Sequence, residues 1–212
     1  MARISPRPID DWSSAMQDAL TAFRPPGSGE PSSPPAEGRP RAGNALGTFA
    51  CYPELAKAYL TFNGHILFAS SLSARQRELL ILRVALLRRC EYEWAQHVVL
   101  GANAGLTSDE IGWIVEGPER PDWDVLDRAM LRAVDELLER AEVSDSTWAE
   151  LALHLDEHQL MDLVFTVGAY ETLAMAFKSF GVEPDVDLVP HLPVNTGAWV
   201  RDGLQHKLKE GQ

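Results

Sequence analysis

The chain has 212 residues, a hydrophobic fraction of 45% and a formal net charge of −12. This length is enough for one buried core with a tail, and the acidic balance excludes nucleic-acid binding because no basic surface would neutralise phosphates. Two cysteines far apart in the chain do not make a disulfide framework, so we expect a cytoplasmic protein.

The first part of the chain predicts a docking helix followed by an arm. Its opening residues lack the apolar core of a signal peptide, so we expect no targeting segment. Residues 4–23 carry large apolar side chains at helical spacing, which favours a short amphipathic helix docked on its own domain or on a neighbouring subunit. These side chains are Trp12, Met16, Leu20 and Phe23. Residues 24–47 are dense in Pro, Gly and Ser, a composition typical of a linker or arm.

From Pro53 onward the apolar residues follow helical periodicity, and no segment alternates with period two. Helix-capping signals stand at Ser73-x-x-Gln76, Thr107-x-x-Glu110, Ser144 and Asp156. A further helix is expected over about 124–140, and Gly181 and Pro184 should end the last long helix. The pattern therefore predicts an all-α fold.

The longest apolar stretch, residues 160–177, contains Asp162 and Glu171. A membrane span needs about twenty residues with few or no charges. We therefore expect a buried helix here and no membrane partner.

The segment 74–89 is apolar around nearly its whole circumference, which predicts burial in the centre of a domain or in an oligomer interface. Glu78 lies one turn inside this segment, where a carboxylate is costly unless it is paired or protonated. One interpretation is an ion pair with a local cation, for which Arg75, Arg77 and Arg83 are available. The other is an acid that takes part in catalysis.

A thiol, a carboxylate and an imidazole recur along the next helical segment. Cys90, Glu93 and His97 stand at i, i+3 and i+7, so they project from the same side of a helix. A carboxylate four residues before a histidine can orient its ring for proton transfer near neutral pH. The spacing alone is equally compatible with a surface Glu–His pair.

Four stretches of the chain carry a family resemblance. They are RQRELLILRVA at 75–85, CEYEWAQH at 90–97, GLTSDEI at 105–111 and the late helix at 160–180. Together they resemble the carboxymuconolactone decarboxylase family, whose relatives are the alkylhydroperoxidase D-like proteins. The resemblance implies an alkylhydroperoxidase D-like helical bundle whose small subunits assemble as trimers or hexamers, with active clefts around the 90–97 segment.

The resemblance covers roughly residues 53–184 and divides the chain into three parts. Residues 1–52 form an N-terminal helix and arm, residues 53–184 the helical domain, and residues 185–212 a C-terminal tail. The expected partners are a small-molecule substrate and further copies of the same chain.

The chain departs from the peroxidase branch of these relatives at one position. That branch is marked by a Glu, eleven further residues and then Cys-x-x-Cys-x-x-x-His. Here Glu78, Cys90 and His97 match, whereas Glu93 replaces the second cysteine. Reduction of a peroxide through an internal disulfide needs both sulfurs, so Cys90 would need an outside thiol. Proton-transfer chemistry therefore ranks above thiol chemistry.

The resulting hypothesis is a cofactor-free acid–base decarboxylation of a small carboxylated lactone or oxo-acid. His97 would handle the proton at the carbon left behind, Glu93 would orient His97, and Glu78 would serve as a second acid or relay. Arg83 is the candidate for binding the anionic substrate, and Tyr92 the candidate for a pocket wall.

Two alternatives remain open. Cys90 could act as a single reactive thiol in a peroxide reductase, or the chain could be a non-catalytic helical oligomer that binds a small molecule. Glu93 and His97 form only a partial ligand set for a metal, and the chain has no phosphate-binding glycine loop or dinucleotide fingerprint. We therefore expect neither a metal nor a cofactor.

Overall fold

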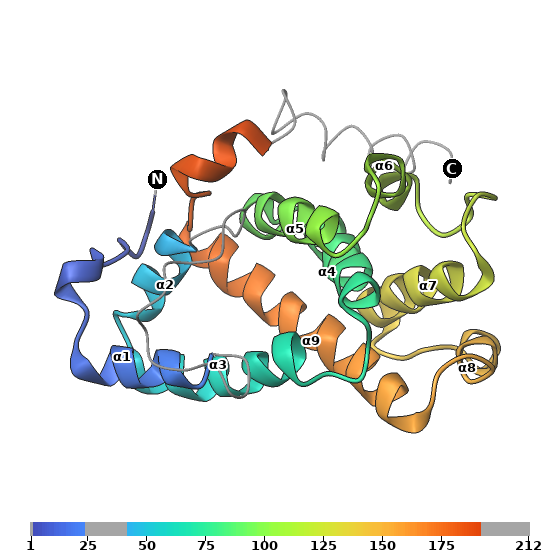
Figure 1. Cartoon of the computed structure of the whole chain (residues 1–212), viewed down its shortest axis with the longest axis horizontal. Coiled ribbons are helices and arrows are strands. Elements are labelled where there is room, and N and C mark those ends of the chain that lie inside the picture. Colours follow the sequence, from blue (N-terminus) through green and yellow to red (C-terminus); the bar gives the residue numbers. More distant parts are fainter. Residues whose placement is uncertain (1, 24–41, 192–212) are drawn as a thin grey trace.

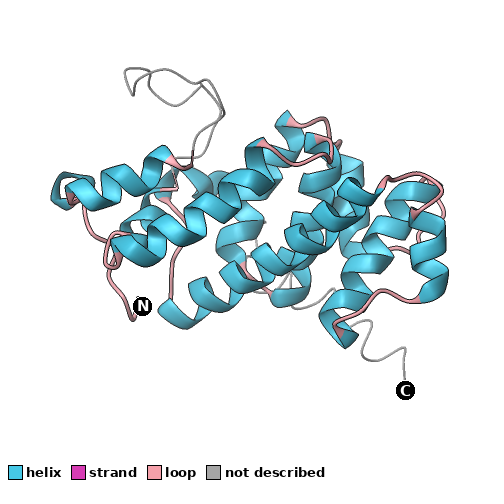
Figure 2. Ribbon diagram, turned by 90° about the horizontal axis from the view of Figure 1, so that it is seen from below, coloured by secondary structure: helices cyan, strands magenta, loops and turns pink. Residues whose placement is uncertain are grey.

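The computed structural model describes residues 2–23 and 42–191. Within these ranges all regular structure is helical, which confirms the predicted all-α fold (Figure 2). The helices are α1 (Ser14–Thr21), α2 (Gly43–Phe49), α3 (Pro53–Phe68), α4 (Ala74–Arg88), α5 (Glu91–Asn103), α6 (Ser108–Glu116), α7 (Val125–Arg140), α8 (Asp145–Leu151) and α9 (Glu157–Phe180), with short 3₁₀ turns at Ile9–Asp11 and Val186–His191.

Helix α4 forms the centre of the molecule (Figure 1). It packs against α5, α7 and α9, so it is enclosed within its own subunit. The apolar residues around its circumference have no exposed surface: Leu79, Leu80, Ile81, Leu82 and Val84. Glu78 is carried into this core on the same helix and is only 2% exposed.

The predicted capping residues begin the helices as expected. Ser73 and Thr107 close reciprocal capping boxes with Gln76 and Glu110, at the starts of α4 and α6. The other capping side chains accept a hydrogen bond from the backbone N–H three residues on: Asp124, Ser144 and Asp156. Gly181 ends α9 with φ of 72°, the left-handed conformation that glycine adopts without strain.

Helix α9 runs diagonally through the molecule and packs against α3, α4 and α7 (Figure 1). By length and composition it is apolar enough to cross a membrane, but half of its apolar window is buried inside the fold. Its acidic residue Asp162 binds the end of α3 and the loop between α3 and α4. The Asp162 carboxylate accepts hydrogen bonds from the Ser71 backbone N–H at 2.6 Å and hydroxyl at 2.7 Å, and it contacts His65 Nε2 at 2.8 Å.

The N-terminal helix docks on its own domain, where α1 packs along α3 (Figure 1). Met16 and Ala19 are fully buried there. The backbones approach closely, because a Cβ added at Gly64 would lie 2.5 Å from the carbonyl oxygen of Ala22. The regular helix occupies only 14–21 of the predicted 4–23.

The prediction of a linker over 24–47 needs a correction at its end. Residues 24–41 lie outside the described residues, whereas α2 begins at Gly43. This helix forms despite the glycines because Ala45, Leu46 and Phe49 pack onto the apolar core.

The start of the predicted tail folds back onto the domain. Asp185 accepts hydrogen bonds from the Tyr92 hydroxyl at 2.9 Å and from the Asn44 backbone N–H at 2.8 Å. It thereby connects α5 with the first turn of α2 beyond the end of α9. Residues 192–212 of the tail lie outside the described residues.

Candidate active site

A cavity of about 340 Å³ lies between α2, α3, α4, α5 and α9, and Phe23 adds to its wall. Most of its lining is apolar and includes Leu60, Phe68, Leu100, Leu173 and Phe177. Its polar side chains include Asn63, Arg77, Glu78, Tyr92, Glu93 and His97. Three of the four predicted catalytic residues therefore share one cavity wall.

His97 is held by Glu78, which reaches it from the neighbouring helix. His97 Nδ1 lies 2.6 Å from Glu78 Oε2, and both side chains are buried. The ring of Tyr170 stands edge-on to the imidazole, with ring centroids 4.9 Å apart and planes at 89°. The ring of His97 is thus fixed in orientation by a carboxylate on one side and an aromatic ring on another.

The expected role of Glu93 as the partner that orients His97 is therefore corrected. The i, i+4 spacing on α5 allows that contact, but the packing of α4 against α5 brings Glu78 to Nδ1 instead. Glu93 is 2% exposed, and neither of its carboxylate oxygens has a hydrogen-bond partner. Burial raises the pKa of Glu93 to about 8, an effect that the neighbouring Cys90 thiol opposes. At neutral pH Glu93 is mainly a neutral carboxylic acid that lines the cavity.

Cys90 precedes α5 as its N-cap residue, at the predicted turn between two helices. It is 2% exposed and does not line the cavity; it borders a separate hollow beside Lys178 and Gly181. Burial, and then the carboxyl group of Glu93, raise the pKa of the Cys90 thiol well above its usual range. The helix N-terminus does not offset these effects, so Cys90 is held as an uncharged thiol.

Arg83, the residue predicted to bind the substrate anion, lies elsewhere. Its Nε and Nη2 each donate to a carboxylate oxygen of Asp135 at 2.7 Å, and its Nη1 donates to the carbonyl oxygen of Ile114 at 2.7 Å. Arg83 is not part of the cavity lining, because this network joins α4 to α7 and α6.

The basic residue in the described cavity lining is Arg77, which sequence reasoning treated only as a local partner of Glu78. Its Nε is buried without a hydrogen-bond partner and lies 3.6 Å from Glu78 Oε1. Asn63 Oδ1, also in the lining, is buried without a partner. The adjacency of Arg77 to Glu78 was the available signal, since neighbouring side chains near a helix start can border the same space.

Tyr92 stands in the wall as predicted, with its hydroxyl group already occupied. It donates to Asp185 Oδ2 at 2.9 Å and accepts from Gln96 Nε2 at 3.0 Å. Its ring packs edge-on against Phe177 with centroids 5.0 Å apart. The ring of Tyr92 therefore shapes the cavity, while its hydroxyl group binds Asp185, which also binds the first turn of α2.

Comparisons with known proteins give one family match and several structures of similar fold. Residues 53–136 match the sequence profile of the carboxymuconolactone decarboxylase family. Among the curated proteins no match to the chain is found.

Several solved structures share the fold. A putative antioxidant defence protein AhpD of unknown function from Agrobacterium tumefaciens is 24% identical, with a TM-score of 0.61 over 65% of this chain and 95% of its own. A peroxidase-related protein with an alkylhydroperoxidase AhpD core from Ralstonia eutropha is 16% identical, with a TM-score of 0.62 over 68% and 78%. The debrominase Bmp8 is 12% identical, with a TM-score of 0.65 over 87% and 93%. At these identities the similarity shows the fold alone.

Proposed function

We propose that this chain, whose residues 53–136 match the carboxymuconolactone decarboxylase family, is a cofactor-free acid–base enzyme. It would catalyse decarboxylation, or a related proton transfer, on a small carboxylated lactone or oxo-acid. The observation that carries the proposal is the 2.6 Å contact between His97 and Glu78 in the wall of a mostly apolar cavity. The same wall contains Glu93, whose raised pKa favours the neutral acid.

In the proposed reaction each of these three groups has a different task. Because Nδ1 of His97 is engaged by Glu78, Nε2 is the ring nitrogen for proton exchange, and Glu78 stabilises the imidazolium when it forms. Glu93 keeps its proton at neutral pH, so it can donate a hydrogen bond to an oxygen on which negative charge develops.

The decarboxylation follows from these assignments. The bond between the substrate carbon and its carboxylate breaks, and carbon dioxide leaves. The electron pair stays on the substrate and spreads into an adjacent carbonyl, whose oxygen receives the hydrogen bond from Glu93. The His97 imidazolium then gives its proton to the carbon. One proton is consumed for each carbon dioxide released, and solvent returns it to His97.

Thiol-dependent peroxide reduction at Cys90 ranks second. A thiolate at Cys90 is disfavoured by burial and by the adjacent Glu93, and the thiol borders a hollow separate from the cavity. The names of the AhpD-like structures keep this alternative worth an assay. A non-catalytic role in binding a small molecule is the third.

The first experiment compares His97→Ala with wild type on a panel of carboxylated lactones and oxo-acids, with carbon dioxide release as the readout. We expect turnover to fall by about 10²- to 10⁴-fold, the usual contribution of a general acid–base residue. His154→Ala is the matched control, because His154 is a partly exposed histidine paired only with Glu150 at 3.5 Å. Wild-type turnover in His97→Ala, with folding verified by circular dichroism, would refute the proposal.

The same proteins separate the alternatives. Peroxide consumption with dithiothreitol as the reductant, present in wild type and lost in Cys90→Ser, would make the thiol the catalytic group. No turnover in either assay, together with a small molecule that co-purifies in the cavity, would support the binding role.

A further inference from the structure

The cavity wall, within the described residues, contains one arginine and two glutamates, and these groups differ in their contacts. Among the described lining residues Arg77 is the one with a permanent positive charge, and the same lining contains the carboxyl groups of Glu78 and Glu93. Glu78 is engaged by His97, and Glu93 is mainly neutral at pH 7. An anionic ligand that enters the cavity therefore has one guanidinium to pair with.

Arg77 retains hydrogen-bonding capacity for such a ligand. Within the described residues, Arg77 approaches an acid where its Nε lies near Glu78 Oε1, and their separation of 3.6 Å is longer than a hydrogen bond. By contrast Arg83, on the same helix, has three donors engaged by Asp135 and Ile114. Arg75 is similarly engaged by Asp127 and Glu110.

A guanidinium whose donors are not consumed by the protein matches a carboxylate in geometry and charge. Its planar fork donates hydrogen bonds to both oxygens of a carboxylate, and such charge-assisted pairs are stronger than neutral hydrogen bonds. The side chain of Arg77 is only 14% exposed, so most of its surface is within the protein. A ligand carboxylate there would pair with the positive charge of Arg77, because the nearby Glu78 is already engaged by His97.

We propose that Arg77 is the carboxylate-binding residue of the cavity, and that the ligand is a flat, ring-sized acid anchored through one carboxylate. The apolar lining accommodates the ring, and the unpartnered oxygens of Asn63 and Glu93 can meet polar substituents on it. This inference rests on the proposed function and deepens it. The carboxylate at Arg77 is one that the reaction keeps, because a guanidinium bound to a departing carboxylate would stabilise the ground state and slow its loss.

The test uses benzoate and benzamide, which have nearly the same shape and differ in charge. Binding is measured by calorimetry on wild type, Arg77→Gln, Arg77→Lys and the control Arg132→Gln. Arg132 is a partly exposed residue outside the cavity lining and pairs with Glu119 at 3.1 Å. We expect Arg77→Gln to weaken benzoate binding by about 10- to 100-fold, as expected for loss of a charged hydrogen-bond partner. Benzamide binding should change little, and Arg77→Lys should recover part of the benzoate affinity.

The outcomes separate a binding role from a structural one. If Arg77 only maintained the fold around Glu78, its replacement would weaken benzoate and benzamide equally, and that result would overturn the inference. Wild type that fails to bind benzoate, or Arg77→Gln that binds it unchanged, would overturn it as well. Because these measurements involve no turnover, their failure is distinct from a failure of His97→Ala to lose activity.

Discussion

Glu78 and Glu93 line the same cavity but have different neighbours. Glu78 lies beside His97 and Arg77, whereas Glu93 is buried without a hydrogen-bond partner. Pairs of acids with different surroundings are a recurring way to provide a charged and a neutral carboxyl group in one site. The division of tasks between the two glutamates follows from burial and neighbours rather than from their spacing.

Glu93 should make stability depend on pH in a defined window. In the unfolded chain its carboxyl group ionises near its ordinary pKa of 4.5, whereas in the folded protein it keeps its proton up to a pKa of about 8. As pH rises from 4.5 to 8 the unfolded state releases this proton first, so the free energy of unfolding falls. Above pH 8 this contribution is fully lost.

Glu93→Gln should remove that dependence. Denaturation at pH 5, 7 and 9 should show a variant that gains on wild type as pH rises, on the order of 1.4 kcal/mol for each unit of pKa shift. Glu91→Gln, on the same helix but exposed, should track wild type. Parallel curves for wild type and Glu93→Gln would show that Glu93 ionises normally in the folded protein.

The sequence identified most residues of the site but not how they pair. The i, i+4 spacing made Glu93 the expected partner of His97, because spacing describes one helix at a time. The contact with Glu78 depends on how α4 packs against α5. The choice of Arg83 over Arg77 failed for the same reason, since Asp135, the partner that occupies Arg83, comes from α7.

Local signals predicted the helices better than they predicted the site. Capping side chains such as Ser73 and Asp156 act within one turn, so the sequence alone reveals where α4 and α9 begin. Helix α2 was missed because the glycines and prolines around it favour a loop. Its stability comes from packing of Leu46 and Phe49 on residues distant in the chain.

The contact between α1 and α3 depends on a missing side chain. A Cβ at Gly64 would lie 2.5 Å from the Ala22 carbonyl oxygen, and backbone cannot move aside easily. Gly64→Ala should therefore destabilise the protein by about 1–3 kcal/mol, the usual cost of overpacking. It should also displace Phe23 from the cavity wall.

Gly112→Ala is the matched control for Gly64→Ala. It also lies within a helix, α6, but nothing stands within 4 Å of its added Cβ. Because alanine favours helices more than glycine does, this variant should be unchanged or stabilised by up to about 1 kcal/mol. Equal thermal denaturation midpoints for the two variants would contradict the close approach of α1.

At the scale of the whole molecule, the cavity unites parts that the sequence predicted to be separate. Phe23 comes from the predicted N-terminal helix and Leu46 from the predicted arm, yet both line the same space as residues of the helical domain. Asp185, at the start of the predicted tail, accepts a hydrogen bond from the cavity residue Tyr92. A division by composition follows the chain, whereas the site is assembled across it.

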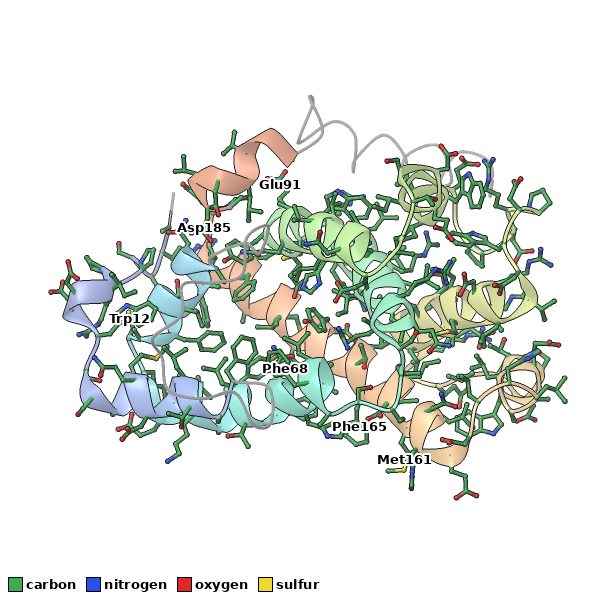
Figure 3. All side chains as sticks on the ribbon, viewed as in Figure 1. Trp12, Phe68, Glu91, Met161, Phe165 and Asp185 are labelled. Atoms are coloured by element: carbon green, nitrogen blue, oxygen red, sulfur yellow. The ribbon has the colours of Figure 1, made fainter. Side chains whose placement is uncertain are left out.

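One outer face of the molecule remains apolar. Met161, Phe165 and Met175 on α9 are each more than half exposed, and Phe62 of α3 packs beside Phe165 with ring centroids 6.1 Å apart. Figure 3 shows Met161 and Phe165 at the outer edge of the molecule. We propose that further copies of this chain cover the face in a trimer or hexamer.

Phe165→Glu should place a charge in that contact and shift the protein toward monomers in sedimentation experiments. Leu153→Glu is the control, because Leu153 is 75% exposed and precedes α9 rather than lying on this face. A wild-type protein that sediments as a monomer at all concentrations would exclude the proposed assembly.

The glutamate at position 93 also determines whether the proposed reaction would need a cellular reductant. None of the described residues that line the cavity is a cysteine. A carboxylic acid exchanges protons with water and needs no reductant after each cycle. Turnover would therefore continue when cellular thiols are depleted, and reagents that alkylate sulfur would find no target in the cavity. The replacement of one thiol by one carboxyl group would therefore make the activity of this site independent of the cellular redox state.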